Sequence, residues 1–237
     1  MSVEAQTTAA VVAVTGLAKE ARIAGGPGVR AIAGGGDARR LAQAIEREVR
    51  LGAQGVISFG IAGGLIDTIA AGDWLVSRVI VTADERFPCD DAWTRALVER
   101  LPGAVTVDLA GCDAPVMEAA VKRALHRATR ASAVDTESHI AARIAAEHRL
   151  PFAAFRVVTD PCDHALPPAA MVAIRPDGTV NVGAVMRSLA RHPRQLPTLV
   201  RLACDSWAAR QALVPSRRFL GPNLGLPDLR QHLLDVA

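Results

Sequence analysis

Tyrosine is absent from the chain, and its five phenylalanines and three tryptophans bring the aromatic residues to only 3% of 237. Proteins that bind single-stranded nucleic acid do so largely by stacking bases on aromatic side chains. The charge excludes the same class of partner, because the net charge is +3 and the basic residues form no dense run. We therefore expect no nucleic-acid partner.

The chain also lacks the cysteine spacing of a disulfide framework or a zinc site. Its four cysteines lie far apart and form no C-x-x-C pair. The N-terminal region has no basic stretch, and the apolar run from Ala9 to Val14 is too short for an export signal or a membrane span. These features predict a cytoplasmic protein that binds no metal ion.

Half of the residues are hydrophobic, which is enough for one large core, and the length suits a single α/β domain. Short apolar runs, read as buried strands, alternate with segments of helical periodicity. The expected strands are Val11 to Thr15, Val29 to Ala33, Gly55 to Phe59, Asp73 to Thr82, Ala104 to Ala110, Ala131 to Val134 and Phe152 to Val158. One helix is expected to start after Asp37. The other expected helices span Asp90 to Leu101, Pro115 to Arg127, Glu137 to Arg149, Val180 to Leu189 and Leu196 to Leu213. This alternation predicts a parallel or mixed sheet that is covered on both faces.

Candidate functional residues gather in the loops that follow the expected strands. In open α/β sheets, ligands bind where strands end and helices begin. Glycines in such loops let backbone amides approach an anion, and a helix N-terminus favours negative charge. The glycine triplet Gly34-Gly35-Gly36 is not the G-x-G-x-x-G fingerprint of dinucleotide-binding proteins, because Arg39 stands where the third glycine of that fingerprint belongs. One rim of the sheet is expected to carry Glu20, Gly34 to Gly36, Gly60 to Gly64, Glu137 and Asp160.

Several segments resemble the nucleoside phosphorylase and methylthioadenosine/S-adenosylhomocysteine nucleosidase superfamily. F-G-I-A-G-G-L from Phe59 is similar to its "T-G-x-A-G-G-L", and G-D-W-L-V-S from Gly72 to its "G-D-I-V-V-S". V-D-T-E from Val134 resembles the "V-E-M-E" that precedes a helix, and R-V-V-T-D from Arg156 resembles "R-x-x-S-D". The resemblance implies one nucleoside phosphorylase-like domain over residues 1–237, with a central mixed, twisted sheet flanked by helices. Its core would span residues 9–163, followed by a C-terminal helical extension over 164–237.

The resemblance also implies roles for three carboxylates. Glu20, in G-L-A-K-E from Gly16, resembles the glutamate of "G-A-M-x-x-E" that organises the attacking water. Glu137 would bind the ribose hydroxyls, with Thr136 standing where the family has methionine. Asp160 would protonate N7 of the departing adenine, a role that suits a buried aspartic acid that retains its proton.

Further positions follow from the same family motifs. Val116, Ala62 and Thr159 would line the nucleobase pocket, although Pro115 replaces the family's usual aromatic residue. Gly34, Gly35 and Gly36 would line the pocket of the nucleophile. Phosphate is a possible co-substrate there, and otherwise no cofactor is expected. The family name favours phosphorolysis, whereas Glu20 favours attack by water, and on the resemblance we expect phosphorolysis. The nearby arginines are Arg22, Arg39 and Arg40.

Within the superfamily, segments such as R-F-P-C-D-D-A-W and D-H-A-L-P-P-A-A resemble the hopanoid-biosynthesis-associated phosphorylases. That branch implies cleavage of adenosylhopane to adenine and a ribosyl or phosphoribosyl hopane. It implies a lipid-linked nucleoside substrate, possible peripheral contact with the inner membrane and a homo-oligomer, expected to be a dimer. We expect the lipid to enter between Phe87 to Trp93 and Leu166 to Ile174.

Three alternatives stay open at this stage. One is a methylthioadenosine or S-adenosylhomocysteine nucleosidase acting on a soluble substrate. Another is a nicotinamide-binding Rossmann enzyme, which the missing G-x-G-x-x-G disfavours. The third is a nucleoside-binding protein without turnover.

Overall fold

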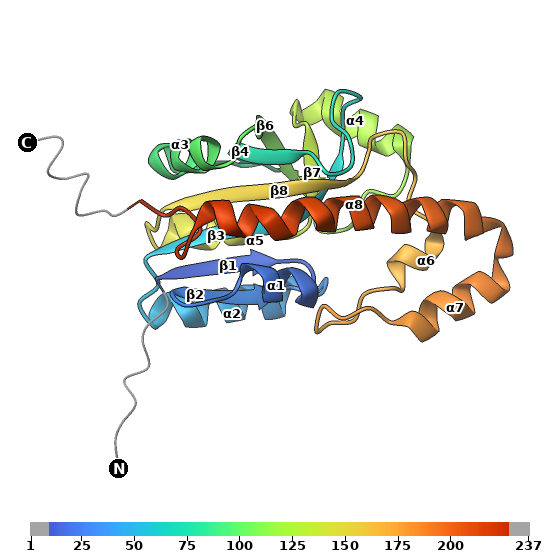
Figure 1. Cartoon of the computed structure of the whole chain (residues 1–237), viewed down its shortest axis with the longest axis horizontal. Helices are drawn as coiled ribbons and strands as arrows, with labels where there is room; N and C mark the ends of the chain where they lie inside the picture. Colours follow the sequence, from blue (N-terminus) through green and yellow to red (C-terminus); the bar gives the residue numbers. More distant parts are fainter. Residues whose placement is uncertain (1–9, 228–237) are drawn as a thin grey trace, which may run out of the picture.

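The computed structural model describes residues 10–227, so Ala9 and both ends of the expected domain lie outside the described residues. One sheet of eight strands forms its centre (Figure 1). The strands are β1 (Val11–Thr15), β2 (Val29–Ala33), β3 (Gly55–Gly64), β4 (Trp74–Val81), β5 (Arg86–Pro88), β6 (Val105–Gly111), β7 (Ala133–Asp135) and β8 (Phe152–Asp160). The helices are α1 (Ala18–Ala24), α2 (Ala38–Arg50), α3 (Asp91–Arg100), α4 (Ala119–Thr129), α5 (Ser138–Glu147), α6 (Pro168–Met171), α7 (Val182–Arg191) and α8 (Leu196–Leu220), with a 3₁₀ turn, η1 (Pro193–Gln195).

The sheet is mixed, as the sequence predicted. Its strand order is β2-β1-β3-β7-β6-β4-β5, and β8 pairs with both β3 and β4. Strand β3 is parallel to β1 and β8 and antiparallel to β7, while β4 is parallel to β6 and antiparallel to β8. Because β6 also pairs with β7, the strands β3, β8, β4, β6 and β7 close into a ring. In the described part of the chain, the strands at the edges of the sheet are β2 and the short strand β5.

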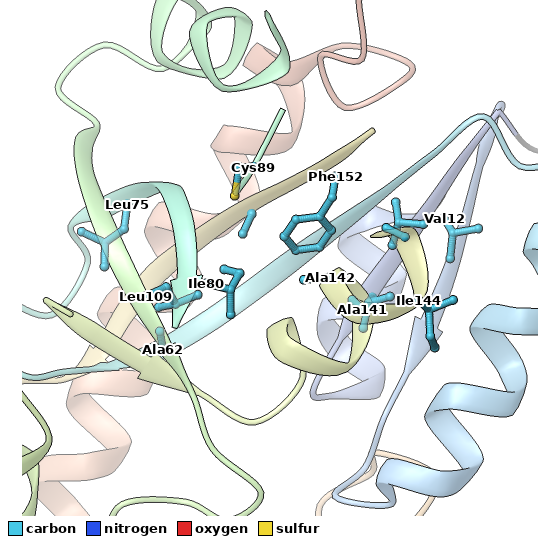
Figure 2. Close-up of a cluster of buried hydrophobic side chains, with 14 of the residues drawn as sticks. Val12, Ala62, Leu75, Ile80, Cys89, Leu109, Ala141, Ala142, Ile144 and Phe152 are labelled. Carbon is cyan, nitrogen blue, oxygen red and sulfur yellow. The ribbon is translucent and has the colours of Figure 1, made fainter. Parts of the chain in front are cut away.

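Helices cover both faces of the sheet, and alternate residues of the central strands point to each side. In β8, Phe152 and Ala154 pack with α2 and α5, whereas Ala153 and Phe155 pack with α3 and α8. Figure 2 shows the first of these clusters, with the Phe152 ring among side chains of the strands and of α5. The nine residues of β8 are all buried. A strand buried on both faces reads as a continuous apolar run, which is why this strand was predictable.

Several boundaries differ from the prediction, and tertiary contacts explain the largest difference. We expected Gly60 to Gly64 to be a loop, but β3 continues through them because β8 and β7 pair with both of its edges. Helix α4 begins at Ala119 rather than Pro115, and α8 continues past Leu213 to Leu220 with Pro215 inside it. The short elements β5 and α6 have no local sequence pattern from which they could be predicted.

Candidate active site

Glu20 lies in the first turn of α1, immediately after β1, and is 3% exposed. Its Oε2 accepts hydrogen bonds from the backbone N–H groups of Gly16 and Leu17, both at 3.0 Å, and its Oε1 accepts one from Ile61 at 3.3 Å. Burial raises the pKa of Glu20 to about 7, although the Arg156 guanidinium opposes the rise. A carboxylate with this pKa is suited to accept a proton near neutral pH.

Gly60 brings β3 close to this carboxylate. A Cβ at Gly60 would lie 2.7 Å from Glu20 Oε2 and 2.9 Å from Arg156 Nη1, and its φ of +151° is rarely adopted by residues with a side chain. The sequence predicted Gly60 to be part of a loop. In the structure a glycine is required there because the side chains of Glu20 and Arg156 both lie close to its backbone. It also places β3 in contact with α1 at the rim.

Arg156, in the middle of the apolar strand β8, is 1% exposed and connects several polar groups beneath the rim. Its Nη2 forms an ion pair with Asp135 and lies 3.6 Å from Glu137 Oε2. The same group donates hydrogen bonds to Ser58 and Ser138. A buried charge is costly unless it is paired and hydrogen-bonded, so this network compensates the burial of two carboxylates at once.

Glu137 immediately precedes α5 and points at the loops that follow β1 and β2. A Cβ at Gly16 would lie 3.2 Å from its Oε1, and one at Gly34 would lie 3.3 Å from its Cγ. Thr136 donates a hydrogen bond to Glu137 Oε1. Burial raises the pKa of Glu137, and Arg156 opposes the rise.

Asp160 is the last residue of β8 and is 5% exposed. Its Oδ2 accepts a hydrogen bond from Lys122 Nζ at 2.6 Å, and a Cβ at Gly63 would lie 2.9 Å from the same oxygen. Burial raises the pKa of Asp160, while the Lys122 ammonium lowers it. Lys122 itself is fully buried and also donates to the carbonyl oxygens of Asp160, Pro161 and His164.

A β-bulge gives Asp160 its direction. The β3–β8 register pairs Ala62 with Val158 and then Gly63 with Asp160, so Thr159 is the extra residue. Bulges re-aim side chains and are frequent next to active sites. The Thr159 hydroxyl is buried and has no hydrogen-bond partner among the described residues, which leaves it available to a ligand. Val116 is half-buried against the small cluster that contains Leu65 and Val134.

The glycine triplet lies at the same rim, but its amides are largely engaged. Gly34 N–H donates to Thr15 O at 2.7 Å and Gly35 N–H to Gly16 O at 3.0 Å. A hairpin over residues 174–180 covers this loop, because a Cβ at Gly35 would lie 2.4 Å from Pro176 O. Arg40 Nη1 donates a hydrogen bond to that same oxygen. Arg22 and Arg39, the other arginines considered for phosphate, are exposed.

The two segments expected to admit a lipid differ in exposure. Trp93 is fully buried against Gly55, the first residue of β3, whereas Asp160 lies beside Gly63 near the other end of that strand. The Phe87 ring lies under the guanidinium of Arg143. The segment from Phe87 to Trp93 therefore does not form the open mouth that we predicted. In the other segment, Met171, Val172 and Ile174 are about half exposed.

Residues 6–191 match the family described as Phosphorylase superfamily. The chain belongs to the phosphorylase superfamily. This confirms the predicted enzyme type, a nucleosidase or nucleoside phosphorylase. A search of the curated proteins found no match.

Solved structures of nucleosidases share the fold of this superfamily member. A 5′-methylthioadenosine/S-adenosylhomocysteine nucleosidase from Helicobacter pylori superposes with a TM-score of 0.62 at 13% identity, covering 97% of this chain and 99% of that one. The corresponding nucleosidase from Colwellia psychrerythraea, in complex with adenine, gives 0.58 at 16% identity, covering 81% and 95%. Futalosine hydrolase from Helicobacter pylori gives 0.56 at 16% identity, covering 63% and 87%. At these identities the likeness supports the single-domain α/β fold that the sequence predicted.

The sequence analysis did not identify two basic residues that contact the candidate carboxylates, Arg156 and Lys122. Arg156 carried a usable signal, because a charge inside an apolar strand must have a buried partner. Lys122 carried none, since its helix shows an ordinary mixed surface pattern in sequence. Among residues 10–227, no group of three histidine, cysteine or acidic side chains is placed to hold a metal ion.

Proposed function

We propose that this phosphorylase-superfamily member cleaves the N-glycosidic bond of an adenine nucleoside. The observation that carries the proposal is the set of three buried carboxylates on one rim, Glu20, Glu137 and Asp160, each with a raised pKa. Each has different partners: backbone amides for Glu20, a threonine and an arginine for Glu137, and a lysine for Asp160. Different environments allow chemically identical groups to take different roles.

In this proposal Asp160 donates a proton to N7 of adenine as the bond between C1′ and N9 breaks. Its Oδ2 is held by Lys122, which leaves Oδ1 as the oxygen that faces the base. Thr159, Ala62 and Val116 line the nucleobase pocket, and the unpartnered Thr159 hydroxyl supports that placement. General acid catalysis of this kind contributes about 10²–10⁴-fold in rate.

Glu137 accepts hydrogen bonds from the ribose hydroxyls and stabilises the positive charge that develops on the sugar. Thr136 fixes one of its oxygens. The proximity of Glu137 to Gly16 and Gly34 supports a sugar position between these loops and β8.

For the nucleophile we propose water rather than phosphate. Water attacks C1′ and gives its proton to Glu20, so that the products are adenine and a free ribosyl compound. Three features support water: the raised pKa of Glu20, the engaged amides of Gly34 and Gly35, and the exposure of Arg22 and Arg39. A buried carboxylate would repel a phosphate dianion, and within residues 10–227 the arginines considered for phosphate, Arg22, Arg39 and Arg40, are all exposed.

The test is to follow the ribosyl product with phosphate supplied and with phosphate withheld. We expect turnover without phosphate and a product that carries none. If turnover requires phosphate and the product is phosphorylated, the reaction is phosphorolysis. Gly34, Gly35 and Gly36 would then line the phosphate pocket, as the sequence predicted.

For the substrate we propose adenosylhopane, an adenosine whose 5′ carbon carries a large apolar ring system. The exposed apolar residues Met171, Val172 and Ile174, in the segment that follows Asp160 in sequence, support an apolar 5′ side of the pocket. Burying about 200 Å² of lipid there would contribute about 5 kcal/mol. The competing substrate is a soluble 5′-thioadenosine, which needs no such surface.

The double substitution Leu166→Asp and Met171→Asp separates these two substrates. It should weaken turnover of the lipid nucleoside much more than that of 5′-methylthioadenosine. Equal losses on both would place the lipid elsewhere, and efficient turnover of the thioadenosine alone would favour the soluble substrate.

A further inference from the structure

A helical arm projects from the domain, formed by residues 168–208: α6, the hairpin over 174–180, α7, η1 and the first half of α8. Only three of its residues are buried, Ala169, Gly178 and Gln195. In Figure 1 the arm extends beyond the end of the sheet, away from α2 and α3. Because almost none of it contributes to the core, its composition is not explained by folding of the domain.

The arm carries most of the exposed apolar surface. Of the fifteen large hydrophobic residues that are exposed in the described chain, nine lie in it. They are Met171, Val172, Ile174, Val180, Val182, Met186, Leu196, Val200 and Trp207. Trp207, 63% exposed, lies seven residues from Val200 and therefore on the same face of α8. Such a concentration marks an interaction surface rather than scattered surface residues.

The arm also carries the positive charge of the chain. It has five exposed arginines and two aspartates, a net charge of +3 that equals that of the whole chain, so the remainder is balanced. The arginines are Arg175, Arg187, Arg191, Arg194 and Arg201. None of the five forms an ion pair with a carboxylate in the part of the chain that the structure describes. Asp205 is engaged by His164 Nδ1 at 2.7 Å, and Asp177 by Thr179.

We propose that the helical arm docks the enzyme on the surface of an anionic lipid bilayer. Exposed apolar side chains beside unpaired arginines suit a layer that offers acyl chains below negative headgroups. A tryptophan is also favoured at that boundary. A second copy of the chain fits less well, because its own arm also carries a net charge of +3 and so offers no complementary charge. Docking would be peripheral, since no helix among residues 10–227 is long and apolar enough to cross a bilayer.

The arm is joined directly to the candidate active site. Its hairpin accepts a hydrogen bond at Gly178 O from the N–H of Ala18, the first residue of the helix that carries Glu20. A docked arm would therefore hold the site's rim close to the lipid surface. The docking goes beyond the proposed reaction and does not depend on it.

The experiment is flotation of the whole protein with vesicles of phosphatidylcholine alone or mixed with phosphatidylglycerol, without any nucleoside. We expect binding only to the anionic vesicles, weakened by salt. Binding should blue-shift the tryptophan emission, and Trp207→Phe should remove that shift because Trp93 is buried and Trp74 is half-buried. Replacing Arg191, Arg194 and Arg201 by Gln should lower partitioning by about 10²-fold. The exposed Arg95 of α3, replaced by Gln, is the control and should change it far less.

The apolar contribution is tested with Val200→Asp and Trp207→Asp, matched by Val98→Asp on α3. The arm variants should lose vesicle binding, and the control should keep it. No binding to anionic vesicles, or equal binding by all variants, would overturn the proposal. If Trp207→Asp instead converts a dimer to a monomer in sedimentation and leaves vesicle binding unchanged, the face is an interface between copies. Absence of adenine release would contradict the proposed reaction without affecting these results.

Discussion

Lys122 Nζ lies 2.6 Å from Asp160 Oδ2, and both side chains are buried where β8 ends. The chain has only two lysines, and one of them is the buried partner of Asp160. Desolvation offsets most of the attraction in a buried ion pair, which makes such a pair a weak source of stability. Its value here is positional, because Lys122 also donates to the carbonyl oxygens of Pro161 and His164.

Lys122→Met should change the pH dependence of turnover. The proposed acid must carry its proton, so activity is present below the pKa of Asp160 and is lost as the pH rises through it. Lys122 lowers that pKa, so its removal should move the high-pH decline upward. Around Asp160, His164 lowers and Asp205 raises the same pKa, and both remain in the variant. The measurement is kcat/KM against pH. Lys19→Met, at the exposed lysine, is the control, and an unmoved decline would make Lys122 purely structural.

Asp160→Asn should leave the fold intact and reduce adenine release by at least about 10²-fold, because an amide cannot act as the acid. Asp163→Asn is the matched control, since the side chain of Asp163 is 69% exposed and lies three residues away. Turnover is measured for both with a 5′-substituted adenosine. Near-native turnover by Asp160→Asn would remove this residue from the mechanism.

Glu20 should make the protein less stable as the pH rises. Its pKa in the folded protein, about 7, exceeds the ordinary value of 4.5. The unfolded chain therefore loses this proton first, and stability falls between those two values, by about 3 kcal/mol in total. Glu20→Gln should make that fall smaller, as measured by urea unfolding at several pH values, and should leave the contributions of Glu137 and Asp160, whose pKa values burial also raises. An identical slope in wild type and variant would show that Glu20 is ionised at its ordinary pKa.

Arg156→Met should destabilise the protein by about 3–5 kcal/mol, because Asp135 and Glu137 would remain buried without their cation. The control is Arg86→Met, whose ion pair with Asp108 is 3.5 Å long and exposed on the arginine side. An exposed pair contributes at most about 1 kcal/mol. The free energy of unfolding is measured with urea for both variants. If both lose the same small amount, Asp135 and Glu137 find other partners when Arg156 is removed.

The sequence predicted the parts of this structure that depend on local pattern. Strands such as Phe152 to Val158 were visible as apolar runs, and Asp37 caps its helix through Arg40 N–H as expected. The positions of Glu20, Glu137 and Asp160 on one rim followed from their places after strands. The continuation of β3 through Gly64 was not predictable, because it depends on pairing with two distant strands.

The basic residues of the site could not be read from sequence for a similar reason. Lys122 reaches Asp160 across 38 residues, and Arg156 reaches Ser58 across 98. Nor does the sequence show that the N–H groups of Gly34 and Gly35 donate hydrogen bonds to the carbonyl oxygens of Thr15, at the end of β1, and Gly16. Local pattern thus located the carboxylates, whereas their partners depend on contacts that only the folded chain makes.

The most direct test of the proposed reaction is adenine release by the purified protein from an adenosine with an apolar 5′ substituent, in buffer without phosphate. We expect the wild type to release adenine with a free ribosyl product, and both Asp160→Asn and Glu20→Gln to release at least about 10²-fold less. No release with or without phosphate, or equal release by wild type and both variants, would contradict the proposed reaction.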